Sequence, residues 1–453
     1  MSNPEKHSSR VLLCAYACSP DRGSEESVGW DTAVQLASRG HQIVVLTRSS
    51  ERMLSEAKAE SIPQEFRPVF VSCDLPAIWT YLLRQLGKIG VDLAYFAWLM
   101  KSRRVVKDLH EAYHFTSSQH VTYARYWMPS PLSNLDIPFV WGPVGGGESI
   151  PAAFLSRYTL KGRGFEALRD MMRRFGESMK MAQSNAKRSH LALANTVESA
   201  NRMKMMGAET IQIMNSAALS EKDQLTLQKN VSKQEQLTFL SVGRLLEWKG
   251  FQLGLEAFSR ANLPNAKYLI VGSGPYKANL VALVKKLGIQ HQVDFIASIP
   301  RSDLFDLMIS AHALVHPSMH ESGGYVCLEM MAAGNPVICL NVGGPSLFVS
   351  NTCGFLASSQ DYEQSLNEMS GFMSRLASES ELGARLGQKG RQRVQESFSM
   401  AVKSNDLSLI HTGAVQTLAE IRSKSRAASR STLSSRTASN GLNRPVSTPQ
   451  VSA

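Results

Sequence analysis

The sequence predicts an α/β protein made of two doubly wound domains, each built around a parallel sheet. Its 453 residues are too many for a single compact core. A buried strand expected over 11–14 leads into a loop, a helix from about 28 to 39 and a second strand over 41–48. The same order of strand, loop and helix begins again at residue 237. Strands that alternate with helices in this way form parallel sheets, which bind ligands at the carboxyl ends of their strands.

Domain limits follow from changes of composition along the chain. We expect a first domain over residues 1–218, a polar linker over 219–236, a second domain over 237–395 and a further helical segment over 396–421. Residues 422–453 hold six Lys or Arg and no acidic residue, and they are rich in Ser and Thr. Such a composition buries too little apolar area to offset the entropy of an ordered chain, so this tail is expected to be disordered.

Composition and apolar patterning indicate a globular protein rather than an exported or membrane-spanning one. The apolar content of 43% is ordinary for a globular chain. The first ten residues lack the apolar core of an export signal, and charges interrupt the most apolar region, 76–100. We therefore expect a cytoplasmic protein without a membrane span. Buried reduced thiols are typical of that compartment, and the cysteines are scattered at Cys14, Cys18, Cys73, Cys327, Cys339 and Cys353.

The net charge of +11 is unevenly distributed. Residues 151–190 carry nine Lys or Arg against three Asp or Glu, and the tail over 422–453 is also basic. The basicity therefore belongs to two local features, and no specific nucleic-acid partner is expected.

One stretch within 151–190 has the pattern of an amphipathic helix. Apolar residues recur at spacings of three and four, at Phe165, Leu168, Met172, Phe175 and Met179, and are flanked by Arg169, Arg173 and Lys180. This pattern suits a helix lying on an anionic membrane, and equally an ordinary surface helix that packs on its own domain. Aromatic residues of 76–100 would add to the same surface, at Trp79, Tyr81, Tyr95, Phe96 and Trp98.

Two carboxylates, Glu321 and Glu329, stand eight positions apart in the second domain. Ser322, Gly323 and Gly324 follow the first carboxylate and lead into a run of good helix formers over 325–333. The first amide N–H groups of a helix have no partner within it, so this glycine turn suits an anion such as a diphosphate. We expect both carboxylates to face one ligand, ahead of a short strand over 337–340.

This block resembles the donor-binding motif of the retaining glycosyltransferases of family four, as found in enzymes of bacterial polysaccharides and lipid-linked glycans. That family has the GT-B fold, in which two Rossmann-like domains face a cleft. The family's Gly-Arg-Leu and Lys-Gly pairs are matched at residues 243–245 and 249–250. The resemblance implies that Arg244, Lys249 and the amides around Gly323 stabilise the leaving diphosphate.

The remaining donor contacts are also implied by the resemblance. Glu321 would hold the sugar hydroxyls and face the oxocarbenium-like centre, and Glu329 would bind the ribose. Ser322, Gly324 and Tyr325 complete the predicted donor site, and the segment 299–301 would border the base. The last helix would cross back to the first domain.

Two features of the first domain resemble the same family. Gly23 lies in a loop similar to the one that faces the donor phosphates, and His120 falls where the family places a histidine facing the donor sugar. A lone histidine is more often a packed core residue. Gly145, Gly146 and Gly147 with Glu148 are expected to form a loop of the cleft, which either contacts the acceptor or only makes a sharp turn. The family's Pro-Asn-Gly turn is replaced by residues 214–218.

The resemblance implies an enzyme that moves a hexosyl unit from a nucleoside diphosphate sugar to a sugar hydroxyl with retention. The acceptor would be a lipid-linked oligosaccharide of exopolysaccharide, capsule or lipopolysaccharide synthesis, at the inner face of the cell membrane. No cofactor is expected, and no metal either, because the sequence contains no Asp-x-Asp pair. The alternatives are a soluble glucan-synthase-type transferase, a GT-B nucleotide-sugar epimerase, and a non-enzymatic protein that binds glycans or nucleic acid.

Overall fold

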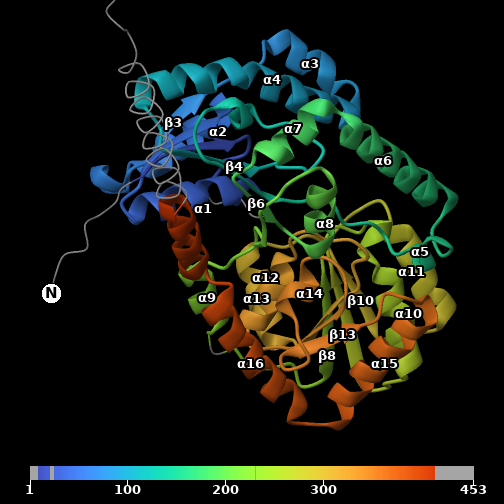
Figure 1. The fold of residues 1–453 in the computed structure, drawn as a ribbon. Helices are drawn as coiled ribbons and strands as arrows, with labels where there is room; N and C mark the ends of the chain where they lie inside the picture. Colours follow the sequence, from blue (N-terminus) through green and yellow to red (C-terminus); the bar gives the residue numbers. More distant parts are fainter. Residues whose placement is uncertain (1–8, 21–24, 230, 414–453) are drawn as a thin grey trace, which may run out of the picture.

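The computed structural model describes residues 9–20, 25–229 and 231–413, which form two α/β domains. Figure 1 shows the first domain above the second, with the chain crossing between them more than once. The basic tail over 422–453 and the end of the predicted segment 396–421 lie outside the described residues.

The first domain is built on a parallel sheet with the strand order β3-β2-β1-β4-β5-β6-β7. Its strands are β1 (Arg10–Ala15), β2 (Gln42–Thr47), β3 (Val69–Ser72), β4 (Ser117–Thr122), β5 (Phe139–Val144), β6 (Leu191–Ala194) and β7 (Ile211–Ile213). The helices along this part of the chain are α1 (Glu25–Ser38), α2 (Ser49–Ala59), α3 (Ala77–Arg84), α4 (Gly87–Tyr113), α5 (Ala152–Leu155), α6 (Leu160–Ser178), α7 (Lys180–Arg188) and α8 (Val197–Met205).

The second domain has a parallel sheet with the order β10-β9-β8-β11-β12-β13. Its strands are β8 (Leu237–Val242), β9 (Ala266–Val271), β10 (Val293–Ile296), β11 (Ala313–His316), β12 (Val337–Leu340) and β13 (Gly354–Ala357). Its helices are α9 (Glu221–Leu227), α10 (Phe251–Ala261), α11 (Lys277–Leu287), α12 (Arg301–Ser310), α13 (Tyr325–Ala332), α14 (Pro345–Phe348), α15 (Tyr362–Ser378) and α16 (Leu382–Ser397).

Each sheet reverses its strand order at one point, and these two points fix where a ligand can bind. The order changes direction between β1 and β4 in the first domain and between β8 and β11 in the second. Loops on either side of such a point diverge at the carboxyl ends of the strands and leave a crevice. The predicted doubly wound architecture is therefore present in both halves.

The connection after β5 enters the core of the second domain. Ile150, Phe154 and Tyr158 are buried within the same apolar cluster as Phe251 and Phe258 of α10. The Phe154 ring also packs edge-on against Tyr362 of α15, with ring centroids 5.3 Å apart. Residues 150–158 therefore pack with the second domain, although they fall inside the predicted first-domain range.

The predicted polar linker contains a helix. Within 219–236, α9 buries Leu227 among apolar side chains of the second domain, so this segment is partly domain core. A helix of about two turns between polar residues is too short to be recognised from sequence. After α16, residues 400–413 are helical and pack on the first domain, where Leu407 joins its apolar cluster and His411 lies buried beside Ser117.

The structure corrects the expected position of two arginines of the amphipathic helix α6. Arg173 is 2% exposed and donates to the backbone oxygen of Gly147 at 2.7 Å, and Arg169 donates to that of Glu148 at 2.7 Å. Arg169 and Arg173 thus point into the protein, whereas the third basic residue of the pattern, Lys180, is exposed. Helical spacing shows which residues share a face, but the contacts that decide which face is buried come from distant parts of the chain.

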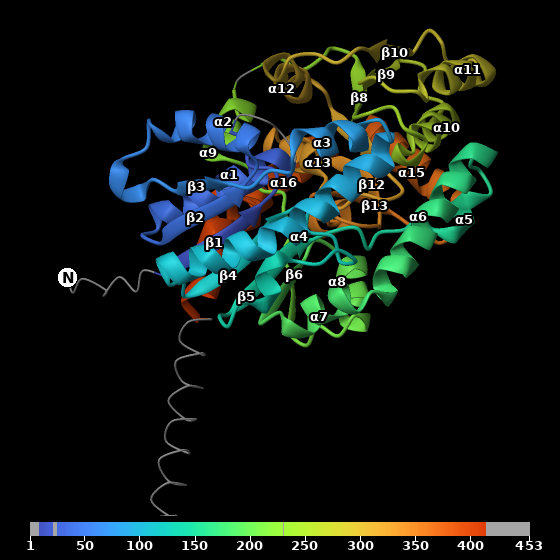
Figure 2. The same cartoon turned by 90° about the horizontal axis from the view of Figure 1, so that it is seen from above.

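Most of the predicted apolar stripe, at Phe165, Leu168, Met172 and Phe175, lies exposed on the outer face of α6. Phe175 is 70% exposed and Met171 is 61% exposed, and both views show the helix at the outer edge of the molecule (Figure 2). The aromatic residues of 76–100 are also only partly at the surface. Trp79 and Tyr81 are exposed, whereas Tyr95 and Trp98 are buried. Among the helices of the described residues, none is long and apolar enough to span a bilayer.

Candidate functional site

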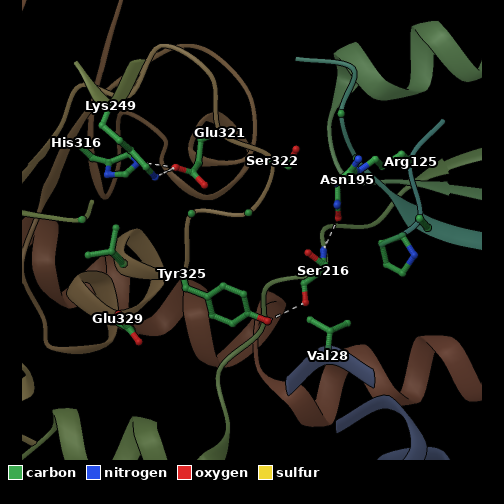
Figure 3. Close-up of a pocket in the computed structure, with 18 of the residues that line it drawn as sticks. Val28, Arg125, Asn195, Ser216, Lys249, His316, Glu321, Ser322, Tyr325 and Glu329 are labelled. Carbon is green, nitrogen blue, oxygen red and sulfur yellow. Dashed lines mark hydrogen bonds and ion pairs between the residues drawn. The ribbon is translucent and has the colours of Figure 1, made fainter. Parts of the chain in front are cut away.

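A cavity of about 570 Å³ lies between the two domains at the points where the sheets reverse their order. The second domain contributes the predicted donor residues Lys249, Glu321, Ser322, Gly323, Gly324, Tyr325 and Glu329. The first domain contributes side chains that include Val28, Val121, Arg125, Trp127 and Asn195. Figure 3 shows Lys249, His316 and Glu321 converging on one side of this cavity, with Glu329 below them on α13.

The glycine turn before α13 has the backbone that the sequence predicted. Gly324 adopts φ +94° as the residue that precedes the helix, a conformation that side chains disfavour. A Cβ at this position would also lie only 3.1 Å from Pro345. The turn leaves the first amide groups of α13 at the cavity wall, where the helix dipole favours an anion.

A second glycine brings Lys249 against this turn. Gly250 has φ +70°, and a Cβ there would lie 1.9 Å from the backbone oxygen of Pro317. No side chain fits at this distance, so the loop after β8 can approach the loop after β11. Lys249 consequently donates a hydrogen bond to the Glu321 carboxylate, and the Nε2 atom of His316 lies 3.8 Å from the same carboxylate.

These neighbours determine the charge of Glu321. Burial is the largest influence and by itself raises the pKa of Glu321, but the charge and hydrogen bond of Lys249, together with His316 and His320, leave the pKa below its ordinary value. Burial, together with the nearby positive charge of Lys249, lowers the pKa of His316 to about 4. At neutral pH the cavity therefore contains a carboxylate, an ammonium group and a neutral imidazole.

Glu329 faces a different cation. Arg301, the first residue of α12, places its Nη2 atom 2.8 Å from Oε1 of Glu329 and 3.3 Å from Oδ2 of Asp223. Burial raises the pKa of Glu329, although Arg301 opposes the shift. The sequence placed 299–301 near a base only through the family resemblance, and the ion pair with Glu329 was not foreseen.

The structure does not bring His120 to the cavity wall. Side chains alternate along β4, so Val121 lines the cavity while His120 lies on the opposite face of the sheet. His120 is 1% exposed, its Nε2 atom is 3.1 Å from the Tyr95 hydroxyl, and burial lowers its pKa to about 4. These are properties of a packed core histidine, which corrects the prediction that it faces the donor sugar.

Two other predicted residues also stand outside the cavity. Arg244 is exposed and is not part of the cavity wall, although its neighbour Gly243 is. Gly23 lies outside the described residues, just before α1.

Sequence analysis missed several residues that line the cavity. His316 is the last residue of β11 and Asn195 comes directly after β6, so each occupies the carboxyl end of a parallel strand. Residues at the carboxyl ends of parallel strands commonly line ligand sites, and this position could have identified both residues from the sequence. Arg125 and Trp127 lie in the loop after β4 and line the cavity from the first domain.

The turn that departs from the family pattern also borders the cavity. The Asn215 side chain accepts a hydrogen bond from the Ala217 amide at 2.8 Å, which closes the turn in place of proline and glycine. Its neighbour Ser216 accepts hydrogen bonds through its backbone oxygen from the Tyr325 hydroxyl at 3.3 Å and from Lys403.

A comparison with protein families matches part of the chain. Residues 223–393 match the family described as Glycosyl transferases group 1. This range begins within α9, ends within α16 and contains every predicted donor-binding residue except Gly23. The second domain is therefore a group 1 glycosyltransferase domain.

Curated relatives match the same part of the chain. The uncharacterized glycosyltransferase MJ1607 of Methanocaldococcus jannaschii is 36% identical over 128 residues, which are 28% of this chain and 33% of that protein. The lipopolysaccharide glucosyltransferase WaaG of Escherichia coli K12 is 33% identical over 148 residues, 31% of this chain and 38% of that protein. The matched region thus spans little more than a third of these relatives' own length.

Solved structures are similar over most of the chain. The crystal structure of WaaG has a TM-score of 0.56 at 19% identity and covers 89% of this chain and 100% of its own. The structure of Anabaena HepE in complex with UDP-glucose has a TM-score of 0.53 at 16% identity and covers 91% of this chain and 100% of its own. These likenesses confirm the predicted GT-B fold.

Proposed function

We propose that this protein is a retaining glycosyltransferase that moves a hexosyl unit from a nucleoside diphosphate sugar to a hydroxyl group of a glycan. The observation that carries the proposal is the position of Lys249, Glu321 and the N-terminus of α13 on one wall of the cavity between the domains. A cation, a helix N-terminus and a carboxylate are the groups that such a transfer needs.

Each group has a distinct role in the proposed reaction. The bond between the anomeric carbon and the diphosphate breaks, so negative charge develops on the leaving phosphate. Lys249 and the amides around Gly324 stabilise this charge, which is the largest catalytic contribution that fixed groups can make. Glu321 faces the positive charge that develops at the sugar ring, and Lys249 keeps it ionised.

The second carboxylate binds the nucleoside part of the donor in this proposal. Glu329 accepts hydrogen bonds from the ribose hydroxyls, and Arg301 orients it. Arg301 and Lys249 supply the positive charge that a divalent cation provides in other transferases, which supports transfer without a metal. Arg244 and Gly23 remain predicted donor contacts at the rim of the site.

The names of the relatives support the classes of donor and acceptor. HepE is described in complex with UDP-glucose, and WaaG is described as acting in lipopolysaccharide biosynthesis. We infer a nucleoside diphosphate hexose as donor here, and as acceptor a lipid-linked oligosaccharide of exopolysaccharide, capsule or lipopolysaccharide synthesis.

A lipid-linked acceptor would require the protein to reach the inner face of the cell membrane. The outer face of α6 suits this contact, because Leu168, Met171 and Phe175 are 43%, 61% and 70% exposed and form an apolar stripe on the surface of the helix. Lys161 and Arg174 are exposed beside the stripe and suit anionic headgroups. Peripheral binding would therefore use apolar insertion rather than the predicted arginines Arg169 and Arg173.

A thermal-shift panel of nucleoside diphosphate sugars tests the proposed donor class. A true donor at about 100 times its dissociation constant should stabilise the protein by roughly 2.7 kcal/mol. The stabilising donor is then incubated with and without a glycan acceptor, and the products are analysed by NMR. Transfer only with acceptor, with the anomeric configuration retained, supports the proposal, whereas a new sugar epimer without acceptor would identify an epimerase.

A further inference from the structure

The loop after β5 ends in a carboxylate that contacts both domains. Glu148 is 3% exposed, and its Oε1 atom accepts hydrogen bonds from the hydroxyls of Thr196 at 2.6 Å and Ser199 at 2.8 Å. Its Oε2 atom accepts from the Gly146 amide at 3.1 Å and from the Ser322 hydroxyl at 2.5 Å. A carboxylate offers about four acceptor positions, so these contacts use all of them. Three of the donors belong to the first domain and the fourth to the second.

The fourth donor belongs to the loop that carries the proposed reacting carboxylate. Ser322 directly follows Glu321, and its backbone oxygen accepts a second interdomain hydrogen bond, from the Asn215 side chain at 2.7 Å. Ser322 is therefore held through its side chain and its backbone by residues that precede the second domain. The position of Glu321 depends on these contacts, because Glu321 is the residue directly before Ser322.

A similar contact supports the other side of the same loop. Glu198, in the first turn of α8, accepts a hydrogen bond from the Gly343 amide at 3.1 Å. The neighbouring Gly344 amide donates to the backbone oxygen of Glu321 at 2.8 Å. The first domain thus holds both the loop of Glu321 and the loop packed against it.

The backbone around Glu148 is fixed by two arginines of α6. Arg169 and Arg173 both donate to the Glu148 backbone oxygen, at 2.7 and 3.3 Å, and Arg173 also donates to that of Gly147. Two of the basic side chains that flank the apolar stripe of α6 therefore order this loop. Glu148 is consequently a rigid acceptor rather than a mobile surface carboxylate.

We propose that Glu148 is a positioning residue that aligns the loop of Glu321 through Ser322 when the two domains are closed. With all four acceptor positions in use, Glu148 is not available to contact an acceptor sugar. Opening of the domains would break the hydrogen bond of Ser322 to a charged group, which is stronger than a neutral one. The donor loop would then have its working geometry only in the closed state, after water has been excluded from the cavity. The catalytic part of this inference rests on the proposed function.

The test compares hydroxyl groups that donate to the same carboxylate from different domains. Ser322→Ala removes the interdomain hydrogen bond, whereas the matched control Ser199→Ala removes a hydrogen bond within the first domain. Glu148→Gln and the double variant Glu148→Gln/Ser322→Ala complete the set. Spin labels at Glu209 and Lys277, exposed residues of the first and second domains, report the separation of the domains without ligand and with nucleoside diphosphate.

Glu148→Gln and Ser322→Ala should shift the ligand-free distance distribution toward longer separations, and Ser199→Ala should leave it unchanged. Glu148→Gln should lower kcat about tenfold, the scale of a misplaced reacting group. In the Ser322→Ala background it should have no further effect on kcat, because the residue acts through Ser322. Restored kcat in Glu148→Asp together with a restored short separation would support the same conclusion.

Two results would overturn the inference. One is an unchanged domain separation in Glu148→Gln, and the other is an equal loss of kcat from Glu148→Gln with and without the Ser322 hydroxyl. Absence of binding to any nucleoside diphosphate sugar would instead count against the proposed function, since the ligand-free separation is measured independently of activity.

Discussion

Lys249 and Glu321 form a partly buried ion pair across the two loops that border the proposed diphosphate site. The pair requires Gly250, whose lack of a side chain lets these loops meet. Lys249 therefore has two roles, since it holds the reacting carboxylate in its charged form and offers a cation to the leaving group.

Removal of Lys249 should weaken nucleoside diphosphate binding. Lys249→Ala removes a charge-assisted contact of about 1.5 to 3 kcal/mol, which corresponds to roughly 10- to 100-fold in the dissociation constant. Calorimetric titration measures this change, and Lys277→Ala, at an exposed position of the same domain, is the control. Arg244→Ala tests the second predicted cation in the same assay. Equal affinity in the wild type and Lys249→Ala, or loss of transfer in EDTA, would contradict a phosphate site that works without a metal.

Glu329 should give the site a preference for ribose. If it accepts hydrogen bonds from ribose hydroxyls, the wild type should bind a nucleoside diphosphate more tightly than its 2′-deoxy analogue, by about tenfold for one lost hydrogen bond. Glu329→Gln should reduce this preference, and Arg301→Met should do so as well, because Arg301 orients the carboxylate. A preference that survives both substitutions would exclude Glu329 from ribose recognition.

The outer face of α6 should determine binding to membranes. Replacing Leu168, Met171 and Phe175 by Gln should release the protein from anionic vesicles, since full burial of each side chain contributes about 1.5 to 3 kcal/mol. Cosedimentation measures the bound fraction. The matched control replaces exposed apolar residues elsewhere, at Met53, Leu54 and Leu409, with exposed fractions of 71%, 44% and 63%.

Both triple variants should retain transfer to a short soluble acceptor. If the control triple releases the protein equally, or if stopping the chain after Ile421 abolishes binding while the α6 triple retains it, the apolar stripe is not the membrane contact. Arg173→Glu should lower the free energy of unfolding rather than act on vesicles selectively, because it places an unpaired charge in a buried position.

Stability should decrease as the pH falls below about 6.5. Burial, together with the adjacent His41, lowers the pKa of His411 to about 3. The unfolded chain therefore binds more protons than the folded chain between these values, so the free energy of unfolding falls toward acid. The loss is at most about 1.4 kcal/mol per pH unit for one histidine.

Denaturant unfolding at pH 7 and pH 5 measures this dependence. His411→Gln should flatten it, whereas His291→Gln, at an exposed position, should leave it unchanged. An identical pH dependence in His411→Gln and the wild type would show that the docking of residues 400–413 on the first domain is not a source of the acid sensitivity.

Local patterns were sufficient to predict much of the second domain. The helix over 325–333 and the strand over 337–340 appear as α13 and β12, because glycine and proline mark their ends in the sequence. The glycine turn and the carboxylates Glu321 and Glu329 lie at one cavity, as their spacing predicted.

Contacts between distant parts of the chain could not be predicted in the same way. Phe154 belongs to the second domain's core, Arg301 pairs with Glu329, and Arg173 faces inward, and each depends on residues far away in sequence. His120 shows the related difficulty that a strand has two faces. The position of His120 in the sequence matched the family motif. In the structure, however, the neighbouring Val121 faces the cavity and the His120 side chain lies on the other face of β4.

Turnover and donor binding in Glu321→Gln together test the central claim most directly. The amide keeps the shape of the side chain but loses the charge that faces the reacting centre. The account predicts donor affinity within about threefold of the wild type by calorimetry and kcat lower by about two orders of magnitude or more, the scale of one lost transition-state interaction. Normal kcat in this variant would contradict the account, because Glu321 would then have no part in the chemistry.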